Sequence, residues 1–320
     1  MLCKTFEGKQ IKNVNLSGNN NMDPDQMKAF LDAVHPLKLN ISDHEFSKAG
    51  SNMMRALNVG ELNMDYAMFA KDFSTDDLVY TLNGGLTKLS MVNSSITTDQ
   101  LKNIATYLKT GISLQSLNLT HVELSEEGIE AVAEIANKPV NGLNQLNLSG
   151  CGLTSGKLAA FGNKIEKKVE FLIISNNPIK DCDTLSKIAG IVHKASTKQL
   201  DMSCCGLTEE VIQKFFSSDT ETINVETIDL SENPGIDPKG TGNMVAKWEV
   251  KNLDLSECLW TANDLSEFSQ SLGQHKLKSV DLSEPMELPT EDKKKLVAEI
   301  TWAENVVYRS RLPDDKKLFI

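Results

Sequence analysis

The sequence predicts an α/β solenoid of about eleven repeats, with a parallel β-sheet on its concave face and α-helices on its convex face. Two observations predict this architecture. A short apolar motif recurs at intervals of about 27 residues between residues 16 and 282. The segments between successive motifs carry apolar residues at helical spacing. Each repeat is therefore expected to run strand, loop, helix and loop.

The strand motif is clearest at residues 143–151, which read Leu-x-x-Leu-x-Leu-x-x-Cys. Residues 225–233 and 250–258 repeat it, with Asn and Cys at the last position. We place its last apolar residue at Leu16, Leu39, Met64, Met91, Leu119, Leu148, Ile174, Met202, Leu230, Leu255 and Leu282. The first three repeats are irregular, because the segments 37–39 and 62–64 are not followed by the closing Asn or Cys.

Helices are predicted between the strands. Residues 98–108 place Leu101, Ile104, Ala105 and Leu108 on one helical stripe. Residues 264–272 and 290–302 show the same pattern. The helix N-caps are expected at Ser125, Thr208 and Thr290, each followed by two acidic residues that suit the helix dipole.

The domain organisation follows from the repeat. Each unit buries its apolar face only against its neighbours, so the array counts as one domain rather than two. We expect the array to cover residues 1–304. Residues 305–320 are expected to form a C-terminal capping segment of the same domain, with residues 306–308 as a terminal strand that covers the last exposed edge.

The recurring motif resembles the leucine-rich repeat family, whose repeats run 20–29 residues and begin with the same pattern. Intervals of 25 to 29 residues are similar to those of its ribonuclease-inhibitor-like subclass, in which a full helix follows each strand and the solenoid is a horseshoe. The resemblance implies a non-enzymatic protein–protein interaction scaffold that works in the cytoplasm.

Composition restricts the partners. The formal net charge is −11, which disfavours nucleic acid and anionic membranes as the main partner. No apolar run approaches the ~20 residues that a membrane-inserted helix needs. The N-terminus has no apolar segment of the secretory type. Six cysteines without a CxxC pair favour a reducing compartment, which would be the host cytosol if the chain is a delivered bacterial effector.

The sequence predicts no catalytic residue, no metal ligand and no cofactor. Cys151, Cys205 and Cys258 fall on the closing Asn/Cys position of the repeat, which explains them as buried structural groups. The remaining cysteines have no identifiable partner base. The five histidines are scattered without metal-binding spacing, and no phosphate-binding loop motif occurs.

The partner-binding hypothesis concerns the concave face. Asp201, Asp229, Asp254 and Asp281 occupy equivalent places on four successive strands, and no Lys or Arg stands in the column before them. Glu232, Glu257 and Glu284 follow at the rim of three of these repeats. Like charges on adjacent strands repel, so this aspartate ladder is expected to bind a partner with a basic segment.

Phe171 and Ile173 place two apolar side chains on the same predicted face, where they could anchor the partner. Structural explanations stay open for both features. Asp-Leu-Ser is common in leucine-rich repeats, where hydroxyls and amides can satisfy the acids, and neighbours could cover the two apolar side chains.

An alternative function is contact regulation of a small GTPase. The GTPase-activating protein of Ran resembles this chain in repeat type and size. Its relatives carry a long acidic tail, whereas residues 313–317 here are mixed in charge. We therefore keep regulation of a GTPase, or action on a host protein as a bacterial effector, as alternatives to the scaffold.

Overall fold

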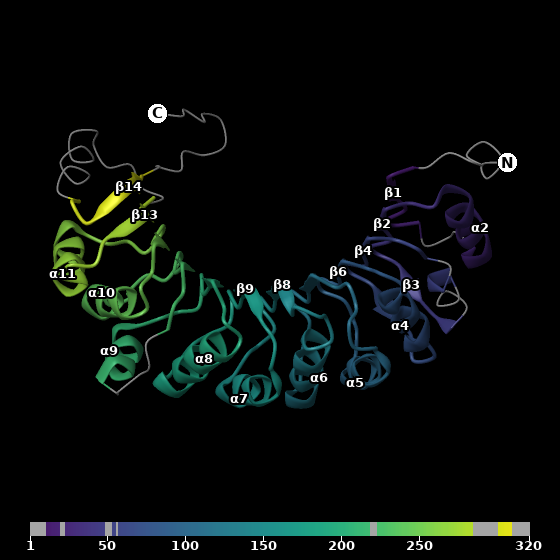
Figure 1. Cartoon of the computed structure of the whole chain (residues 1–320), viewed down its shortest axis with the longest axis horizontal. Coiled ribbons are helices and arrows are strands. Elements are labelled where there is room, and N and C mark those ends of the chain that lie inside the picture. The colour runs from purple at the N-terminus through teal and green to yellow at the C-terminus, as the bar shows by residue number, and fades with distance from the viewer. Residues whose placement is uncertain are drawn as a thin grey trace. The chain divides into compact units, whose positions relative to one another are not determined.

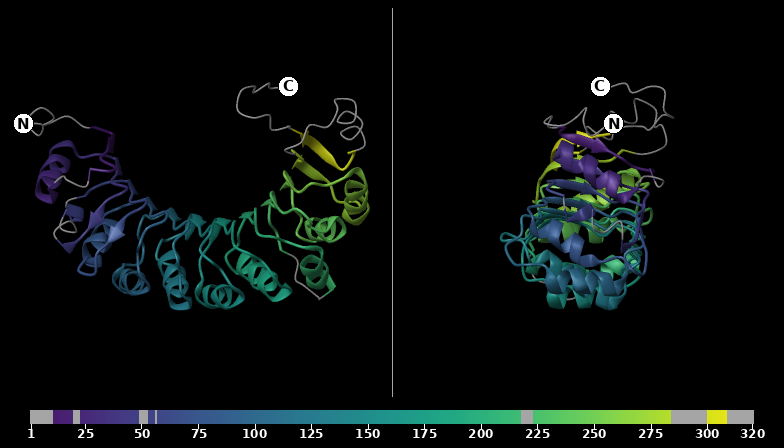
Figure 2. Two further views of the ribbon diagram at one scale, coloured as in Figure 1. Left: turned by 180° about the vertical axis from the view of Figure 1, so that it is seen from behind. Right: turned by 90° about the vertical axis from the view of Figure 1, so that its right-hand side faces the viewer.

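The computed structural model describes residues 11–19, 23–48, 53–55, 57–217, 223–283 and 300–308. The chain divides into two compact units, Met1–Ile173 and Ile174–Ile320. In each unit, parallel strands form one layer and the larger helices cover one side of it (Figures 1 and 2). We call the side of the strands that faces away from these helices the open face.

The first unit alternates strands and helices. Its sheet strands are β1 (Asn13–Asn15), β2 (Lys38–Asn40), β4 (Glu61–Asn63), β6 (Lys88–Ser90), β7 (Ser116–Asn118), β8 (Leu143–Asn147) and β9 (Val169–Ile173), paired in that order. Its helices are α2 (Pro24–Val34), α4 (Thr75–Asn83), α5 (Thr98–Tyr107), α6 (Glu126–Ala136) and α7 (Ser155–Lys164). The sequence did not predict a separate pair of short parallel strands, β3 (Glu45–Phe46) and β5 (Met68–Phe69).

The second unit continues the alternation. Its helices are α8 (Cys182–Lys194), α9 (Glu209–Ser217), α10 (Pro238–Lys247) and α11 (Ala262–Leu272). Its strands are β10 (Gln199–Asp201), β11 (Thr227–Asp229), β12 (Asn252–Asp254), β13 (Leu277–Asp281) and β14 (Ala303–Val307). A terminal strand is present and pairs in parallel with β13, but it spans residues 303–307 rather than the predicted 306–308.

The strand register confirms the predicted repeat with one correction. Leu39 pairs with Val14 and Leu62, the central residues of their strands, so it is not the last apolar residue of the second repeat. That residue is Ile41, which is fully buried. The error arose because apolar residues alternate through positions 37, 39 and 41, and two registers two residues apart place the same faces inward.

Three helices begin where the sequence indicates, and a fourth begins earlier. In α5, Thr97 and Gln100 form a reciprocal capping box, and Leu101, Ile104 and Ala105 are buried. Ser125 is the N-cap of α6, and α9 begins directly after Thr208. The helix α11 begins two residues earlier than residue 264, after Thr261, which forms a second capping box with Asp264.

The helix predicted at residues 290–302 is not supported by the part of it that the structure describes. Of its residues 290–302, only 300–302 are described, and these are not helical. Thr290 itself lies outside the described residues. The prediction that the whole chain is one domain stays a prediction, as does the assignment of residues 305–320 as a cap.

The closing Asn and Cys residues tie each turn to the repeat before it. The Cys151 thiol donates to the Leu119 carbonyl at 3.1 Å, and the Cys258 thiol donates to the Leu230 carbonyl at 3.2 Å. The Asn233 amide donates to the Met202 carbonyl at 3.1 Å, which is the same kind of contact. Buried carbonyls need such partners, so these residues have the structural role that the sequence predicts. Among the described helices, none is both long and apolar enough to cross a membrane.

Candidate functional site: an acidic open face

The four aspartates of the ladder lie side by side on the strands of the second unit. The pairing places Asp201 beside Asp229, Asp229 beside Asp254, and Asp254 beside Asp281. Neighbouring strands are about 4.8 Å apart, so the carboxylates form the row that the repeat predicts. All four side chains are half-buried.

Each aspartate also closes a local turn. One carboxylate oxygen accepts the backbone N–H of the serine two residues later, at 2.8 to 2.9 Å. Three of these serines also donate their hydroxyls to the same oxygen, at 2.6 to 2.7 Å. These bonds hold the chain as it leaves the strand, which is the structural role that Asx side chains commonly have.

The turn does not require a negative charge. The equivalent column of the first unit holds Asn15, Asn40, Asn63, Ser90, Asn118, Asn147 and Ile173. The five asparagines accept the same backbone N–H with their side-chain oxygen, at 2.8 to 3.0 Å. An amide oxygen therefore closes this turn as well as a carboxylate oxygen does. The turn therefore explains why a side-chain oxygen stands at these four positions of the second unit. It does not explain why all four side chains are negatively charged.

The environment of Asp229 opposes its charge. Burial raises the pKa of the Asp229 carboxyl above its usual range, and the neighbouring carboxylates of Asp254 and Asp201 raise it further. The hydrogen bonds from Ser231 act in the opposite direction but do not reverse the shift. A cationic ligand on the open face would relieve this repulsion, because an opposite charge favours the ionised carboxyl.

The rim glutamates occupy the left-handed residue of the turn. Glu232 has φ 57° and Glu257 has φ 59°, and their backbone N–H groups donate to the Ser256 and Ser283 carbonyls. Glu232 is exposed and Glu257 is half-buried. Glu284 lies outside the described residues. Left-handed backbone favours Gly and Asn, so the glutamates are not there for the turn geometry.

The two apolar candidates belong to the first unit, whereas the ladder belongs to the second. Phe171 pairs with Gln145 and is half-buried. Ile173 pairs with Asn147 and is only 8% exposed. Little of Ile173 is therefore available to a partner, and any apolar anchor rests on Phe171.

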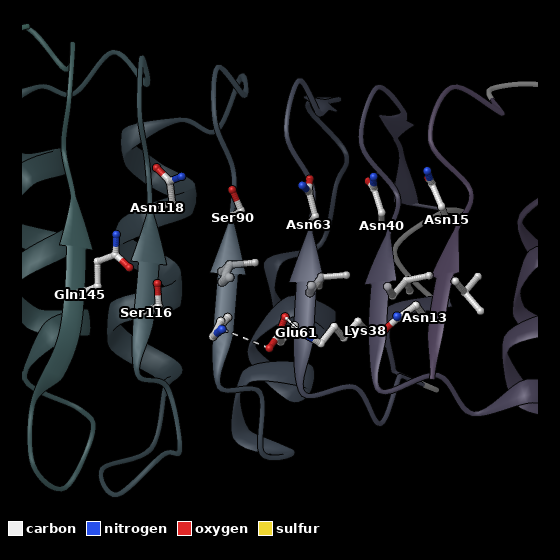
Figure 3. Close-up of a pocket in the computed structure, with 15 residues that line it drawn as sticks. Asn13, Asn15, Lys38, Asn40, Glu61, Asn63, Ser90, Ser116, Asn118 and Gln145 are labelled. Carbon is white, nitrogen blue, oxygen red and sulfur yellow. Dashed lines mark ion pairs between the residues drawn. The ribbon is translucent and has the colours of Figure 1, made fainter. Parts of the chain in front are cut away.

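A second polar cluster, which the sequence interpretation missed, lies on the open face of the first unit. Glu61 forms ion pairs with Lys38 at 2.9 Å and with Lys88 at 3.2 Å (Figure 3). The pairing places these three residues in one column on neighbouring strands. The wrong register of the second repeat placed Lys38 in the next column, so the contact between Lys38 and Glu61 could not be inferred from the sequence.

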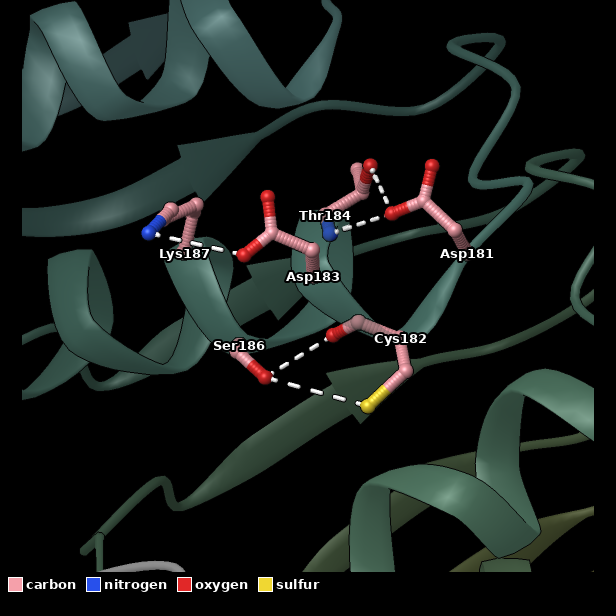
Figure 4. A network of polar contacts seen from close by, with 6 residues as sticks. All are labelled: Asp181, Cys182, Asp183, Thr184, Ser186 and Lys187. Atoms are coloured by element: carbon pink, nitrogen blue, oxygen red, sulfur yellow. Dashed lines mark hydrogen bonds and ion pairs between the residues drawn. The ribbon is translucent and has the colours of Figure 1, made fainter.

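Three of the thiols that the structure describes are Cys151, Cys205 and Cys182. Burial raises the pKa of Cys151 to about 11 and that of Cys205 to about 12, so both stay protonated near neutrality. Cys182 begins α8, where its sulfur lies 4.0 Å from the Ser186 hydroxyl oxygen (Figure 4).

The other contacts around Cys182 are those of a capped helix end. Asp181 accepts the Thr184 backbone N–H at 2.7 Å, and Asp183 forms an ion pair with Lys187 at 3.5 Å. Within the described part of the chain, no group of three or more His, Cys, Asp or Glu residues is arranged to hold a metal ion.

Comparison with known proteins gives distant relatives. No protein-family model matches the chain. The chain is 22% identical over 283 residues to mouse NACHT, LRR and PYD domains-containing protein 5, a match that covers 81% of this chain and 24% of that protein. It is 23% identical over 204 residues to mouse ribonuclease inhibitor, a match that covers 61% of this chain and 45% of the inhibitor. The chain thus spans less than half the length of both relatives.

Solved structures show the same fold. The crystal structure of the yeast Rad7 and Elc1 complex contains a chain that matches with a TM-score of 0.54 at 13% identity, covering 95% of this chain and 76% of that one. Three findings indicate the same repeat fold: the strand motif, the parallel register with a helix between most strands, and the similarity to these proteins. The chain therefore has the leucine-rich repeat solenoid fold, and its sequence is similar to proteins of the ribonuclease-inhibitor-like type.

Proposed function

We propose that the protein is a non-enzymatic scaffold that binds a partner protein, and that the aspartate ladder on the open face of its second unit binds a basic segment of that partner. One observation supports the proposal above the others. The first unit closes the same turn with asparagine, so the four negative charges of the second unit are not needed for folding.

The polar column beside the ladder supports a basic ligand. Gln199, Thr227, Asn252 and Ser279 occupy this column, and none of them neutralises the aspartates. Asn252 and Ser279 are already bonded to each other, at 2.8 Å, and Asn252 donates to the Thr227 hydroxyl at 3.1 Å. Lysine or arginine side chains of a partner can supply the missing cations, which would steer association and fix its register.

The proposed compartment is a reducing cytoplasm. The buried thiols support it, because Cys151 and Cys205 each donate to a backbone carbonyl as a thiol and would lose that bond on oxidation. The similarity to ribonuclease inhibitor is in keeping with an interaction scaffold. The partner's identity would come from affinity capture.

The test compares two double variants. Asp229→Asn with Asp254→Asn removes two charges and keeps both turns, because the amide oxygen still accepts the serine N–H. Glu249→Gln with Glu267→Gln removes two charges from exposed residues away from the ladder. Binding of a lysine-rich peptide and of captured partner proteins is then measured for both variants and for the unmodified chain.

We expect the ladder variant to lose about tenfold or more in affinity, equivalent to at least about 1.4 kcal/mol. The control variant should bind within about twofold of the unmodified chain, because it changes the net charge equally without touching the ladder. Equal binding by the ladder variant and the unmodified chain would overturn the proposed site.

A further inference from the structure

The open face of the first unit carries a groove of about 460 Å³ that crosses the strands from β1 to β8. Polar side chains line its floor in two columns (Figure 3). One column contains Asn13, Lys38, Glu61, Lys88, Ser116 and Gln145. The other contains Asn15, Asn40, Asn63, Ser90 and Asn118. None of the described residues that line this groove is aromatic.

The charges of the groove are unequal. Lys38 and Lys88 flank a single carboxylate, so one positive charge is left over among the lining residues. The side chains of both lysines are 56% exposed, whereas that of Glu61 is 30% exposed. An ammonium group has three donors, and each lysine therefore keeps donors for a ligand after it has bonded to Glu61.

The asparagines add further donors. The side-chain oxygens of Asn15, Asn40 and Asn118 accept the backbone N–H two residues later, so their amide NH₂ groups are the part left to face the groove. These NH₂ groups donate to no acceptor among the residues that the structure describes. Figure 3 shows Asn15 and Asn40 on neighbouring strands and Asn118 farther along the same row, beyond Asn63 and Ser90.

The nearby acceptor Asp65 is already engaged. Its carboxylate accepts from the Asn63 amide at 2.9 Å, the Val92 backbone N–H at 2.8 Å and the Ser90 hydroxyl at 2.5 Å. Its oxygens therefore have little capacity for a ligand's donors. The groove as a whole offers donors in excess, in contrast to the carboxylates on the open face of the second unit.

We propose that this groove binds an extended acidic segment of a partner protein, with Lys38 and Lys88 pairing with its carboxylates and the asparagine amides donating to its carbonyl and carboxylate oxygens. The span from β1 to β8 is five strand spacings, or about 24 Å, which matches about seven residues of extended chain. A compact anion would fill only part of that length. This site is separate from the aspartate ladder and takes the opposite charge.

The probe is a fluorescently labelled peptide of about twelve residues, rich in glutamate, titrated at low and at raised salt and followed by anisotropy. Lys38→Met with Lys88→Met should weaken its binding about tenfold or more. The control, Lys102→Met with Lys109→Met, removes two exposed lysines of the same unit from outside the groove and should change binding less than about twofold.

Two further variants keep both lysines. Glu61→Gln removes the competing carboxylate and should tighten binding about threefold or more, because both lysines become available to the peptide. Asn40→Asp with Asn118→Asp keeps the turns and places negative charge in the groove, so it should weaken binding about tenfold. These variants answer the question even if the lysine double variant fails to fold.

Three results would overturn the proposal: no saturable binding of the acidic peptide to the unmodified chain, an equal loss in the control variant, or unchanged binding in Glu61→Gln. Lysine-dependent binding of a single-stranded oligonucleotide without binding of the peptide would also overturn it, in favour of a nucleic-acid site. Because the probe is acidic and the variants lie in the first unit, failure here leaves the proposed function of the second unit untouched.

Discussion

Replacing Asp229 by asparagine should stabilise the protein near neutral pH. In water, two unit charges about 4.8 Å apart repel by about 0.9 kcal/mol. Asp229 has a carboxylate neighbour on each side, Asp201 and Asp254, so removing its charge relieves about 1.7 kcal/mol. The Ser231 hydroxyl would then bond to a neutral oxygen instead of a charged one, which costs about 1 kcal/mol. The net gain in unfolding free energy is about 0.7 kcal/mol.

The gain should depend on pH with a definite sign. The folded-state pKa of Asp229 is raised, so the contribution of this carboxyl to stability is present below its unfolded pKa of about 3.9 and is lost as pH rises through the folded value. The variant and the unmodified protein should therefore be equally stable near pH 3, and the variant should gain as pH rises toward 6. Salt should reduce the gain by screening.

Urea unfolding at several pH values and two salt concentrations measures these effects. Asp229→Ala is the matched control, because it removes the charge and the turn acceptor together and should destabilise by about 1 kcal/mol or more relative to Asp229→Asn. If Asp229→Asn is less stable than the unmodified protein at pH 7, or gains equally at pH 3, then repulsion within the ladder is not the cause.

Three further predictions concern the thiols, the core and catalysis. In the native protein near pH 8, a thiol reagent should label exposed Cys204 and leave Cys205 unlabelled until urea unfolds the chain, because burial raises the Cys205 pKa to about 12. Mass spectrometry locates the label, and labelling of Cys205 in the native protein would contradict its burial. Phe268→Ala should cost about 3–5 kcal/mol in urea unfolding, since Phe268 is fully buried with Trp260 and Trp302 at ring-centre distances of 5.3 and 5.0 Å, and a loss under about 1 kcal/mol would contradict that packing. Because we propose binding alone, GTP hydrolysis by a panel of small GTPases should be unchanged by the protein, and acceleration of any one of them would favour a contact regulator.

Much of the fold could be predicted from the sequence because the strand motif recurs at a regular interval, and this interval defines each repeat. The strand motif and the stripe of Leu101, Ile104 and Ala105 are local patterns, and the structure has the strand and helix that they predict. Register is less local. At residues 37–41 the alternation fits two registers equally, and the pairing with Val14 and Leu62 decides between them.

The candidate site was predictable only in part. The row of aspartates follows directly from the period, and the structure has it. Whether a side chain on a strand is covered depends on its neighbours in space, so the burial of Ile173 could not be inferred from its position in the motif. The ion pair of Glu61 with Lys38 depends on the register of the second repeat, and the wrong register concealed it.

The bonds of the closing Asn and Cys residues make whole repeats exchangeable. Asn233 donates back to the Met202 carbonyl, and Cys258 donates back to the Leu230 carbonyl, so each repeat offers the next the same acceptor. Deleting residues 231–255 would remove one complete repeat and join Leu230 to Ser256, which brings Cys258 to the position that Asn233 occupied. Such a deletion shortens the second unit by one repeat and keeps a donor in reach of the Met202 carbonyl, whereas a cut that is not a whole repeat would leave this carbonyl unpaired. The protein can thus be lengthened or shortened only in whole repeats.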